Sequence, residues 1–373
     1  MKKLLSLAIS IVMVLSLLAG CGGGASNGTP ASGSSGASNG TAQPKETEKS
    51  ADTAKSGEDA GNAVRRHAFI FKNTGNPYGE KEMEGFRVAI EDELGGQAIL
   101  KAPDQPTAEA QIQMIEELIA QKVDSISITG NDPDALQPAL TKAMNQGIKV
   151  LSADSAVNTQ SRIVHINQAD PERIGRVQIQ AIYEMIGGEG EIAVLSATSQ
   201  ATNQNTWIEW MKKELEDPKY EKVKLVKVAY GDDLRDKSVA ETEGLLRSYP
   251  NLKGIIAPTT VGIAAAGLVL TDKQLQGKVH LTGLGLPSEM AEYIENGVCQ
   301  WMYLWNPIDV GYLTGYAAHA LVEGKITGSV GDKLDAGRLG EKEVVEDGDG
   351  TQIMLGDPFR FDAENIAEWK TVY

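Results

Sequence analysis

Short apolar runs alternate with longer amphipathic segments along most of the chain after His67. The first run, 67–71, has the length and composition of a buried strand, and a helical pattern follows it at 79–94. The same order of strand and helix then repeats. We expect further strands at 98–100, 125–129, 148–151, 192–196, 223–228, 254–257 and 279–282, and further helices at 107–122, 133–146, 171–186, 203–216, 236–248 and 260–272.

This alternation predicts an α/β protein with parallel sheets that are buried on both faces by right-handed crossover helices. The repeats are too numerous for one doubly wound sheet of ordinary size. We therefore expect two lobes, with the first break near Asn167 and Gln168. In open α/β sheets a ligand binds beyond the carboxyl ends of the strands, so two facing lobes would enclose a small ligand in the cleft between them.

The N-terminal segment has the pattern of a secretory signal. Lys2 and Lys3 precede an apolar stretch, and the whole of 1–20 reads as a signal peptide. The junction Leu18-Ala19-Gly20-Cys21 has the form of a bacterial lipobox, in which the signal is cut before the cysteine and the cysteine carries a lipid. The alternative is a plain secretory peptide with a chance cysteine.

The next segment, 21–64, is composed almost entirely of small and polar residues and contains no aromatic residue. Such a composition cannot bury enough apolar surface to order itself. A flexible chain of this length has a reach of roughly 35 to 40 Å. We expect a tether that holds the folded body near a membrane, which places the protein outside the cytoplasm, on the cell surface or in the periplasm.

Composition excludes several classes of function. With 51 acidic against 35 basic residues and a formal net charge of −16, the chain has no basic stripe for nucleic acid. Two cysteines and four separated histidines provide neither a disulfide framework nor a metal cluster, and we expect no metal and no cofactor. If Cys21 carries the lipid, Cys299 stays unpaired, and we expect it to be a small buried apolar residue.

Two acidic segments invite interpretation as calcium sites, but neither has EF-hand spacing. We interpret the first, Asn131-Asp132-Pro133-Asp134, as a helix start in which Asp132 is the N-cap. The second, Glu346-Asp347-Gly348-Asp349-Gly350, has the residues of a hairpin turn.

In the first lobe, polar side chains follow two predicted strands. Lys72 comes directly after the first strand and Tyr78 lies at the start of the following helix; a capping turn is the alternative interpretation of this loop. Asp154 follows the strand that ends near 152, and no helix pattern follows it at once. A carboxylate accepts hydrogen bonds only and can bind two vicinal hydroxyls, so we favour hydroxyl recognition by Asp154.

In the second lobe, a run of uncharged hydrogen-bonding residues, 199–206, leads into a helix that contains Trp207. Trp207, Trp210, Trp301 and Trp305 lie in two short segments that could converge. The alternative for Trp207 and Trp210, which are spaced i and i+3, is a place in the core. A flat ring beside amides and a carboxylate suits a sugar, which has C–H faces and hydroxyl edges.

An enzymatic mechanism has little support in the sequence. None of the four histidines lies on a nucleophile elbow such as Gly-x-Ser-x-Gly, and His165, within a strand pattern, is typical of a buried, hydrogen-bonded histidine. The glycines of 187–190 end a helix and lack the residues of a phosphate loop. We therefore predict that the protein is not an enzyme.

At these loops the sequence resembles the type I (ribose-binding-like) solute-binding proteins of bacterial ABC importers, and within them the branch of rhamnose-binding proteins and Lsr-type autoinducer-2 receptors. The resemblance covers nearly all of 66–373. It rests on Phe71-Lys-Asn-Thr-Gly-Asn-Pro-Tyr78, Asn131-Asp-Pro-Asp-Ala-Leu136, Ala153-Asp154-Ser155, Ile166-Asn-Gln168, Thr202-Asn-Gln-Asn-Thr-Trp207, Ile255-Ile-Ala-Pro-Thr-Thr260 and Leu304-Trp-Asn-Pro307.

The resemblance implies two doubly wound lobes that are joined by three chain crossings and close by hinge motion on a ligand. We expect 65–167 plus 307–330 in the N-terminal lobe, and 168–306 plus 331–373 in the C-terminal lobe. The implied ligand-binding residues are Lys72, Tyr78, Asp154, Asn203, Gln204, Trp207, Pro258, Thr260 and Trp305.

The chain departs from the family pattern at three positions. The autoinducer-2 receptors of this branch carry Asp where this chain has Asn203 and Ala where it has Thr260, and many members carry Trp where it has Ala153. Asn203 resembles the rhamnose side of the branch, so we rank a rhamnose-like deoxy sugar above autoinducer-2 as the ligand.

The resulting hypothesis is a monomeric, lipid-anchored, solute-binding protein that delivers a monosaccharide to an ABC transporter permease. The alternatives are an autoinducer-2 receptor, a transcriptional regulator with the same core and an extracellular sugar-modifying enzyme. The regulator would need a basic helix-turn-helix where this chain has a signal and a tether. The enzyme would need paired acid and base carboxylates in the cleft.

Overall fold

The computed structural model describes residues 64–373. The predicted signal peptide at 1–20, the lipidation site Cys21 and the rest of the predicted tether up to residue 63 lie outside the described residues. Within 64–373, none of the helices combines the length and the apolar character that a membrane crossing requires.

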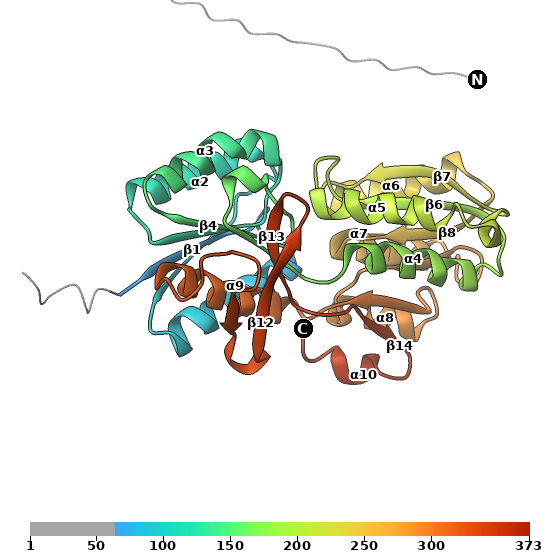
Figure 1. Ribbon diagram of the computed structural model, residues 1–373. Helices are drawn as coiled ribbons and strands as arrows, with labels where there is room; N and C mark the ends of the chain where they lie inside the picture. Colours follow the sequence, from blue (N-terminus) through green and yellow to red (C-terminus); the bar gives the residue numbers. More distant parts are fainter. Residues whose placement is uncertain (1–63) are drawn as a thin grey trace, which may run out of the picture. The chain divides into compact units, whose positions relative to one another are not determined.

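Strands and helices alternate through most of the described chain (Figure 1). The strands are β1 (Arg66–Ile70), β2 (Gln97–Lys101), β3 (Ser125–Ile128), β4 (Lys149–Ala153), β5 (Val164–Asn167), β6 (Gly190–Ser196), β7 (Val223–Tyr230), β8 (Leu252–Ala257), β9 (His280–Gly283), β10 (Trp301–Leu304), β11 (Lys333–Asp335), β12 (Glu341–Asp347), β13 (Gly350–Met354) and β14 (Phe359–Asp362). The α-helices are α1 (Pro77–Arg87), α2 (Ala108–Ala120), α3 (Pro133–Asn145), α4 (Pro171–Met185), α5 (Thr202–Glu214), α6 (Arg235–Ser248), α7 (Thr260–Asp272), α8 (Pro287–Glu295), α9 (Pro307–Val322) and α10 (Ile366–Trp369). A π-helical turn, η1 (Val88–Glu93), continues α1, and short 3₁₀ turns occur at η2 (Thr159–Ser161), η3 (Pro218–Tyr220) and η4 (Gly337–Leu339).

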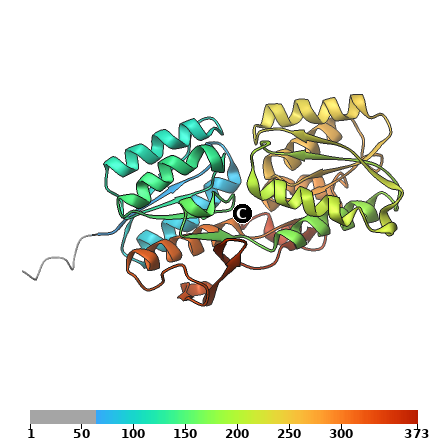
Figure 2. The same cartoon turned by 45° about the horizontal axis from the view of Figure 1, so that its top comes forward.

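The first lobe is built on an eight-stranded sheet with the order β11-β12-β13-β5-β4-β3-β1-β2. Strands β1 to β5 pair in parallel, β13 joins β5 in parallel, and β12 pairs with both β11 and β13 in antiparallel fashion. Helices α2 and α3 pack together on one face of this sheet, and α1 packs with α9 on the other (Figure 2).

Alternating side chains of the central strands explain why both faces of this sheet are covered. In β1, Ala68 and Ile70 belong to the apolar cluster under α2 and α3, whereas Phe69 belongs to the cluster under α1 and α9. All three side chains are fully buried. A strand that is apolar on both faces needs a helical layer on each side, and the crossover helices supply it.

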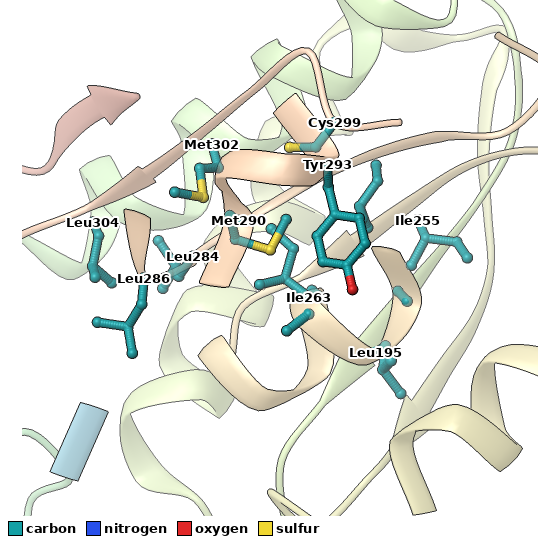
Figure 3. Close-up of a cluster of buried hydrophobic side chains, with 14 of the residues drawn as sticks. Leu195, Ile255, Ile263, Leu284, Leu286, Met290, Tyr293, Cys299, Met302 and Leu304 are labelled. Atoms are coloured by element: carbon teal, nitrogen blue, oxygen red, sulfur yellow. The ribbon is translucent and has the colours of Figure 1, made fainter. Parts of the chain in front are cut away.

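The second lobe has a parallel four-stranded sheet with the order β7-β6-β8-β9 and a small antiparallel pair, β10-β14. Helices α4 and α5 pack on one side and α6, α7 and α8 on the other. Figure 3 shows part of its core, in which Leu195 and Ile255 from the central strands lie near Ile263 of α7 and Met290 of α8.

The expected fold class is confirmed, and every predicted strand and helix is present, with ends that differ by a few residues in all but the first helix. Asp132 caps α3 by accepting hydrogen bonds from the Asp134 and Ala135 amides, and the turn between β12 and β13 is the expected hairpin. The helix expected at 79–94 is α-helical only up to Arg87 and continues as the π-helical turn.

One predicted boundary was wrong. We expected 331–373 in the C-terminal lobe, but β11, β12 and β13 extend the sheet of the first lobe, where Ile353 pairs with Ile166 of β5. Buried apolar side chains of this hairpin join the first-lobe core, and the buried Arg162 guanidinium binds Asp347 at 2.8 Å. The third crossing between the lobes therefore lies between Met354 and Phe359 rather than at 330.

Candidate ligand-binding site

A cavity of about 360 Å³ lies where the loops after the strands of both lobes meet. The cavity is lined by all the side chains implied as ligand-binding, Lys72, Tyr78, Asp154, Asn203, Gln204, Trp207, Pro258, Thr260 and Trp305. The cavity is also lined by six residues that were not predicted to bind the ligand, namely Phe71, Asn76, Asp233, Thr259, Leu284 and Leu304.

Strand ends position most of these residues. Lys72 and Asp154 follow β1 and β4, which are separated in the sheet by β3 alone, and Pro258 follows β8. Asn203 lies in the first turn of α5, and Trp305 directly follows β10. Because the carboxyl ends of parallel strands meet at one edge of a sheet, loops far apart in sequence converge on one cavity.

Lys72 and Asp154 form a buried ion pair with 3.1 Å between Nζ and Oδ2. Burial disfavours the ammonium, but the carboxylates of Asp154 and Asp233 outweigh it and raise the pKa of Lys72 above its usual value. Asp154 adopts a left-handed backbone conformation with φ of 57°. Such conformations cost energy outside glycine and cluster at functional sites.

Hydrogen bonds connect the two lobes at the edge of the cavity. Asn203 donates from Nδ2 to Asp154 Oδ1 at 3.0 Å. Beside this contact, the hydroxyl oxygens of Ser155 and Thr202 lie 3.1 Å apart, and Thr202 donates to the carbonyl of Ala156. Residues of the two lobes are therefore in direct contact beside the cavity.

Two hydrogen bonds from the β6 end and the loop after it orient the carboxamide of Gln204. Its Oε1 accepts hydrogen bonds from Ser196 Oγ and from the Ala197 amide, both at 2.7 Å. This assignment leaves the amide NH₂ without a hydrogen-bond partner among residues 64–373, and Gln204 lines the cavity. Gln204 is therefore held as a donor for a ligand oxygen.

Aromatic rings form another part of the cavity wall. Trp305 donates its indole N–H to Tyr78 Oη at 2.8 Å, and the two rings meet edge to face. The ring of Trp207 lies 5.7 Å from that of Trp305, centroid to centroid. Trp210 and Trp301 do not join them, because Trp210 stacks under Arg176 and Lys213 and Trp301 stacks under Arg360.

Two buried acids near the cavity were missing from the sequence-based prediction. Asp233 lines the cavity and accepts a hydrogen bond from the Thr259 hydroxyl; burial raises its pKa, which Lys72 and that hydrogen bond oppose. Glu82 is fully buried, and neither carboxyl oxygen has a partner among the described residues. Burial and then the Asp154 charge raise the pKa of Glu82 well above its usual value, which favours its neutral form.

The sequence pattern could have indicated a site role for Asp233 but not for Glu82. Asp233 lies just beyond β7, but the strand was expected to end at 228 and extends to Tyr230, so the acid was not recognised as a strand-end residue. Glu82 lies within α1, where a charged residue is usually exposed, and nothing in the local pattern predicts its burial.

Other predicted features take ordinary structural roles. His165 is buried with Nδ1 at 2.9 Å from Ser152 Oγ, as expected for a hydrogen-bonded core histidine. Cys299 is unpaired and fully buried, and burial raises the pKa of its thiol. Among residues 64–373, no three His, Cys, Asp or Glu side chains gather in a way that could hold a metal ion.

Comparison with known families matches residues 67–326 to the periplasmic binding protein domain. The chain belongs to the periplasmic binding protein family. Proteins of this family are solute receptors and not enzymes. Among curated relatives, the D-xylose-binding periplasmic protein of Haemophilus influenzae is 26% identical over 264 residues, which cover 69% of this chain and 75% of the relative.

Solved structures of the same family include receptors with sugars bound. An ABC transporter solute-binding protein from Clostridium phytofermentas with bound L-rhamnose is 50% identical, with a TM-score of 0.81 over 83% of this chain and 99% of that protein. LsrB from Clostridium saccharobutylicum in complex with AI-2 is 22% identical, with a TM-score of 0.77 over 82% and 99% of the two chains, and its likeness concerns the fold alone.

Proposed function

We propose that this periplasmic binding protein is the receptor of an ABC importer and binds L-rhamnose or a similar deoxy sugar in the cavity between its lobes. The observation that carries the proposal is the composition of that cavity. The buried pair of Lys72 and Asp154, the oriented amide of Gln204 and the Trp305 ring line it together. A pyranose presents hydroxyl edges to such polar groups and C–H faces to such rings. The 50% identity to a protein with L-rhamnose bound supports the choice of sugar.

Closure of the lobes would couple binding to transport. Asp154 and Lys72 come from the first lobe, whereas Gln204 and Thr260 come from the second. A ligand that contacts both sets binds the closed form more tightly than the open form, and it shifts the equilibrium by that difference in affinity. The closed form would then be the one that the permease recognises.

The protein is proposed to act outside the cytoplasm as a monomer that is attached to the membrane through a lipid on Cys21. The lipobox-like sequence before Cys21 and the polar segment that follows it support the attachment. Expression of the chain with labelled palmitate should label the wild type and leave Cys21→Ser unlabelled and released from the membrane fraction. Equal labelling of both would contradict the attachment site.

Titration calorimetry with L-rhamnose, ribose and autoinducer-2 tests the ligand. We expect saturable binding of L-rhamnose and weaker or undetectable binding of the other two. Asn203 and Thr260, which differ from the residues expected in autoinducer-2 receptors, support this order. Tight binding of autoinducer-2 with no response to L-rhamnose would replace the importer proposal with a receptor for that signal.

A further inference from the structure

The cavity wall carries both polar and apolar side chains, which are called here its polar part and its apolar part. Lys72, Asp154 and Asp233 are charged or acidic groups of the polar part, to which the amides and threonines also belong. Leu284 and Leu304 belong to the apolar part and are 2% and 1% exposed. Neither leucine was predicted from the sequence as a ligand-binding residue.

The two leucines are the cavity-facing edge of the second-lobe core. Leu284 directly follows β9, Leu304 ends β10, and a backbone bridge between Leu284 and Tyr303 joins the two segments. Figure 3 shows both leucines at one side of the cluster, with Met302 and Met290 beside them. A wall backed by packed core side chains has little freedom to move or to admit water.

The polar group of one neighbouring ring is already engaged. The Trp305 indole N–H is used in its hydrogen bond to Tyr78, so the ring offers carbon atoms to the cavity. A hydroxyl group placed against Leu284 and Leu304 would lose its water without finding a partner on either side chain. A methyl group in the same place would gain dispersion contacts and leave no polar atom unpaired.

We propose that Leu284 and Leu304 form a methyl-recognition surface that makes the site selective for a 6-deoxy sugar over its 6-hydroxy parent. The inference rests on the proposed sugar-binding function. It assigns the C5 substituent of the sugar to the apolar part of the cavity wall. The hydroxyl groups of the sugar face the ion pair and the amides, and its methyl group on C5 faces the two leucines.

A series of sugars that differ only at C5 tests the surface in the wild-type protein by calorimetry. L-Lyxose, L-rhamnose and L-mannose carry hydrogen, methyl and hydroxymethyl at that carbon and share the remaining hydroxyl configuration. We expect L-rhamnose to bind best, L-lyxose about tenfold more weakly and L-mannose on the order of 100-fold more weakly. L-Mannose binding as tightly as L-rhamnose would overturn the inference and leave the proposed function standing. Failure of all of these sugars to bind would reject the proposed function itself.

A matched pair of variants tests the residues. Leu286 lies two positions after Leu284, is as deeply buried and does not line the cavity. Leu284→Asn should reduce the preference for L-rhamnose over L-mannose about tenfold, because the amide can bond the extra hydroxyl. Leu286→Asn should leave that preference unchanged.

The ratio of the two affinities within one variant cancels any general loss of stability. If Leu284→Asn does not fold, as judged by circular dichroism, Leu284→Thr serves the same comparison. An unchanged preference in a folded Leu284 variant would remove that leucine from the methyl-recognition surface.

Discussion

Asp154 combines two constraints at one residue. Its backbone is left-handed, and its carboxylate is buried between Lys72 of its own lobe and Asn203 of the other. Each constraint is unfavourable by itself, and the ion pair and hydrogen bond offset them in part. The left-handed backbone and the ion pair with Lys72 fix the direction of the carboxylate, which reduces the cost of ordering this side chain when a ligand binds.

Removal of the Asp154 carboxylate should weaken sugar binding. We expect Asp154→Ala to reduce the free energy of L-rhamnose binding by about 1.5 to 3 kcal/mol, the range for hydrogen bonds to charged groups. Calorimetry measures the change, and Asp236→Ala on the exposed first turn of α6 is the control. Unchanged affinity would exclude Asp154 from the ligand contacts.

The buried imidazole of His165 should make the free energy of unfolding depend on pH. Burial, and then the Arg162 charge, lower the pKa of His165 to about 3. The unfolded chain takes up this proton near pH 6.5 while the folded protein does not, so the free energy of unfolding falls as the pH drops from 6.5 towards 3. The loss from this residue should be about 2 kcal/mol between pH 7 and 5.

Urea unfolding of the wild type and His165→Asn at several pH values measures this contribution. The variant lacks the titrating group and retains a side chain that can reach Ser152, so its stability should fall less over that range. Parallel pH profiles of the two proteins would contradict the assignment to His165. His67, whose pKa burial lowers to about 4, is present in both proteins and cancels in the comparison.

At the scale of elements, α9 returns the chain to the first lobe and packs closely on α1. A Cβ atom added at Gly311 of α9 would lie 1.7 Å from the Glu82 carbonyl oxygen, and one at Gly85 of α1 would lie 1.9 Å from the Ile308 carbonyl oxygen. Both contacts involve backbone atoms, which cannot move aside as a side chain does. Glycine at these positions therefore sets the distance between the two helices.

Gly311→Ala should separate α9 from α1 and destabilise the protein by at least about 2 kcal/mol, as in other overpacked cores. Gly244→Ala is the matched change in a helix interior, because nothing lies within 4 Å of the added Cβ there. That variant should be more stable by about 0.5 to 1 kcal/mol. Urea unfolding compares the two, and equal effects would contradict the close contact.

At the scale of the whole molecule, three chain crossings connect the two lobes, and hydrogen bonds beside the cavity hold them together. Asp154 is only 5% exposed, so a sugar can reach it only after the lobes separate. The hydrogen bond between Asn203 and Asp154 and the contact of Ser155 with Thr202 must then break and re-form around the ligand. Binding should therefore depend on the freedom of the lobes to open.

A disulfide across the lobes tests this requirement. Ser155 and Thr202, whose hydroxyl oxygens lie 3.1 Å apart, are changed together to cysteine in a chain that also carries Cys21→Ser. The oxidised protein should bind L-rhamnose at least an order of magnitude more slowly than the reduced protein, as measured by stopped-flow tryptophan fluorescence. Addition of dithiothreitol should restore the rate, and equal rates in both forms would contradict entry through opening of the lobes.

The sequence by itself determined the order of the strands and helices, and with it the loops that carry the candidate ligand residues. The reason is local: the periodicity of apolar positions specifies each element, and parallel strands place their following loops at one edge of the sheet. Lys72 and Asp154 could be found in this way because each lies within two residues of the end of a buried strand.

Only the tertiary structure decided the features that depend on contacts between distant segments. The β12–β13 hairpin joins the first lobe because β13 pairs with β5 and because Arg162 binds Asp347 across 185 positions of sequence. Glu82 is fully buried within the tertiary structure, and its backbone carbonyl lies against Gly311 of α9. Leu284 and Leu304 have the pattern of any core residue, and they line the cavity because the second-lobe core reaches its wall. Local patterns carry no information on such long-range neighbours, which arise when separate elements pack together.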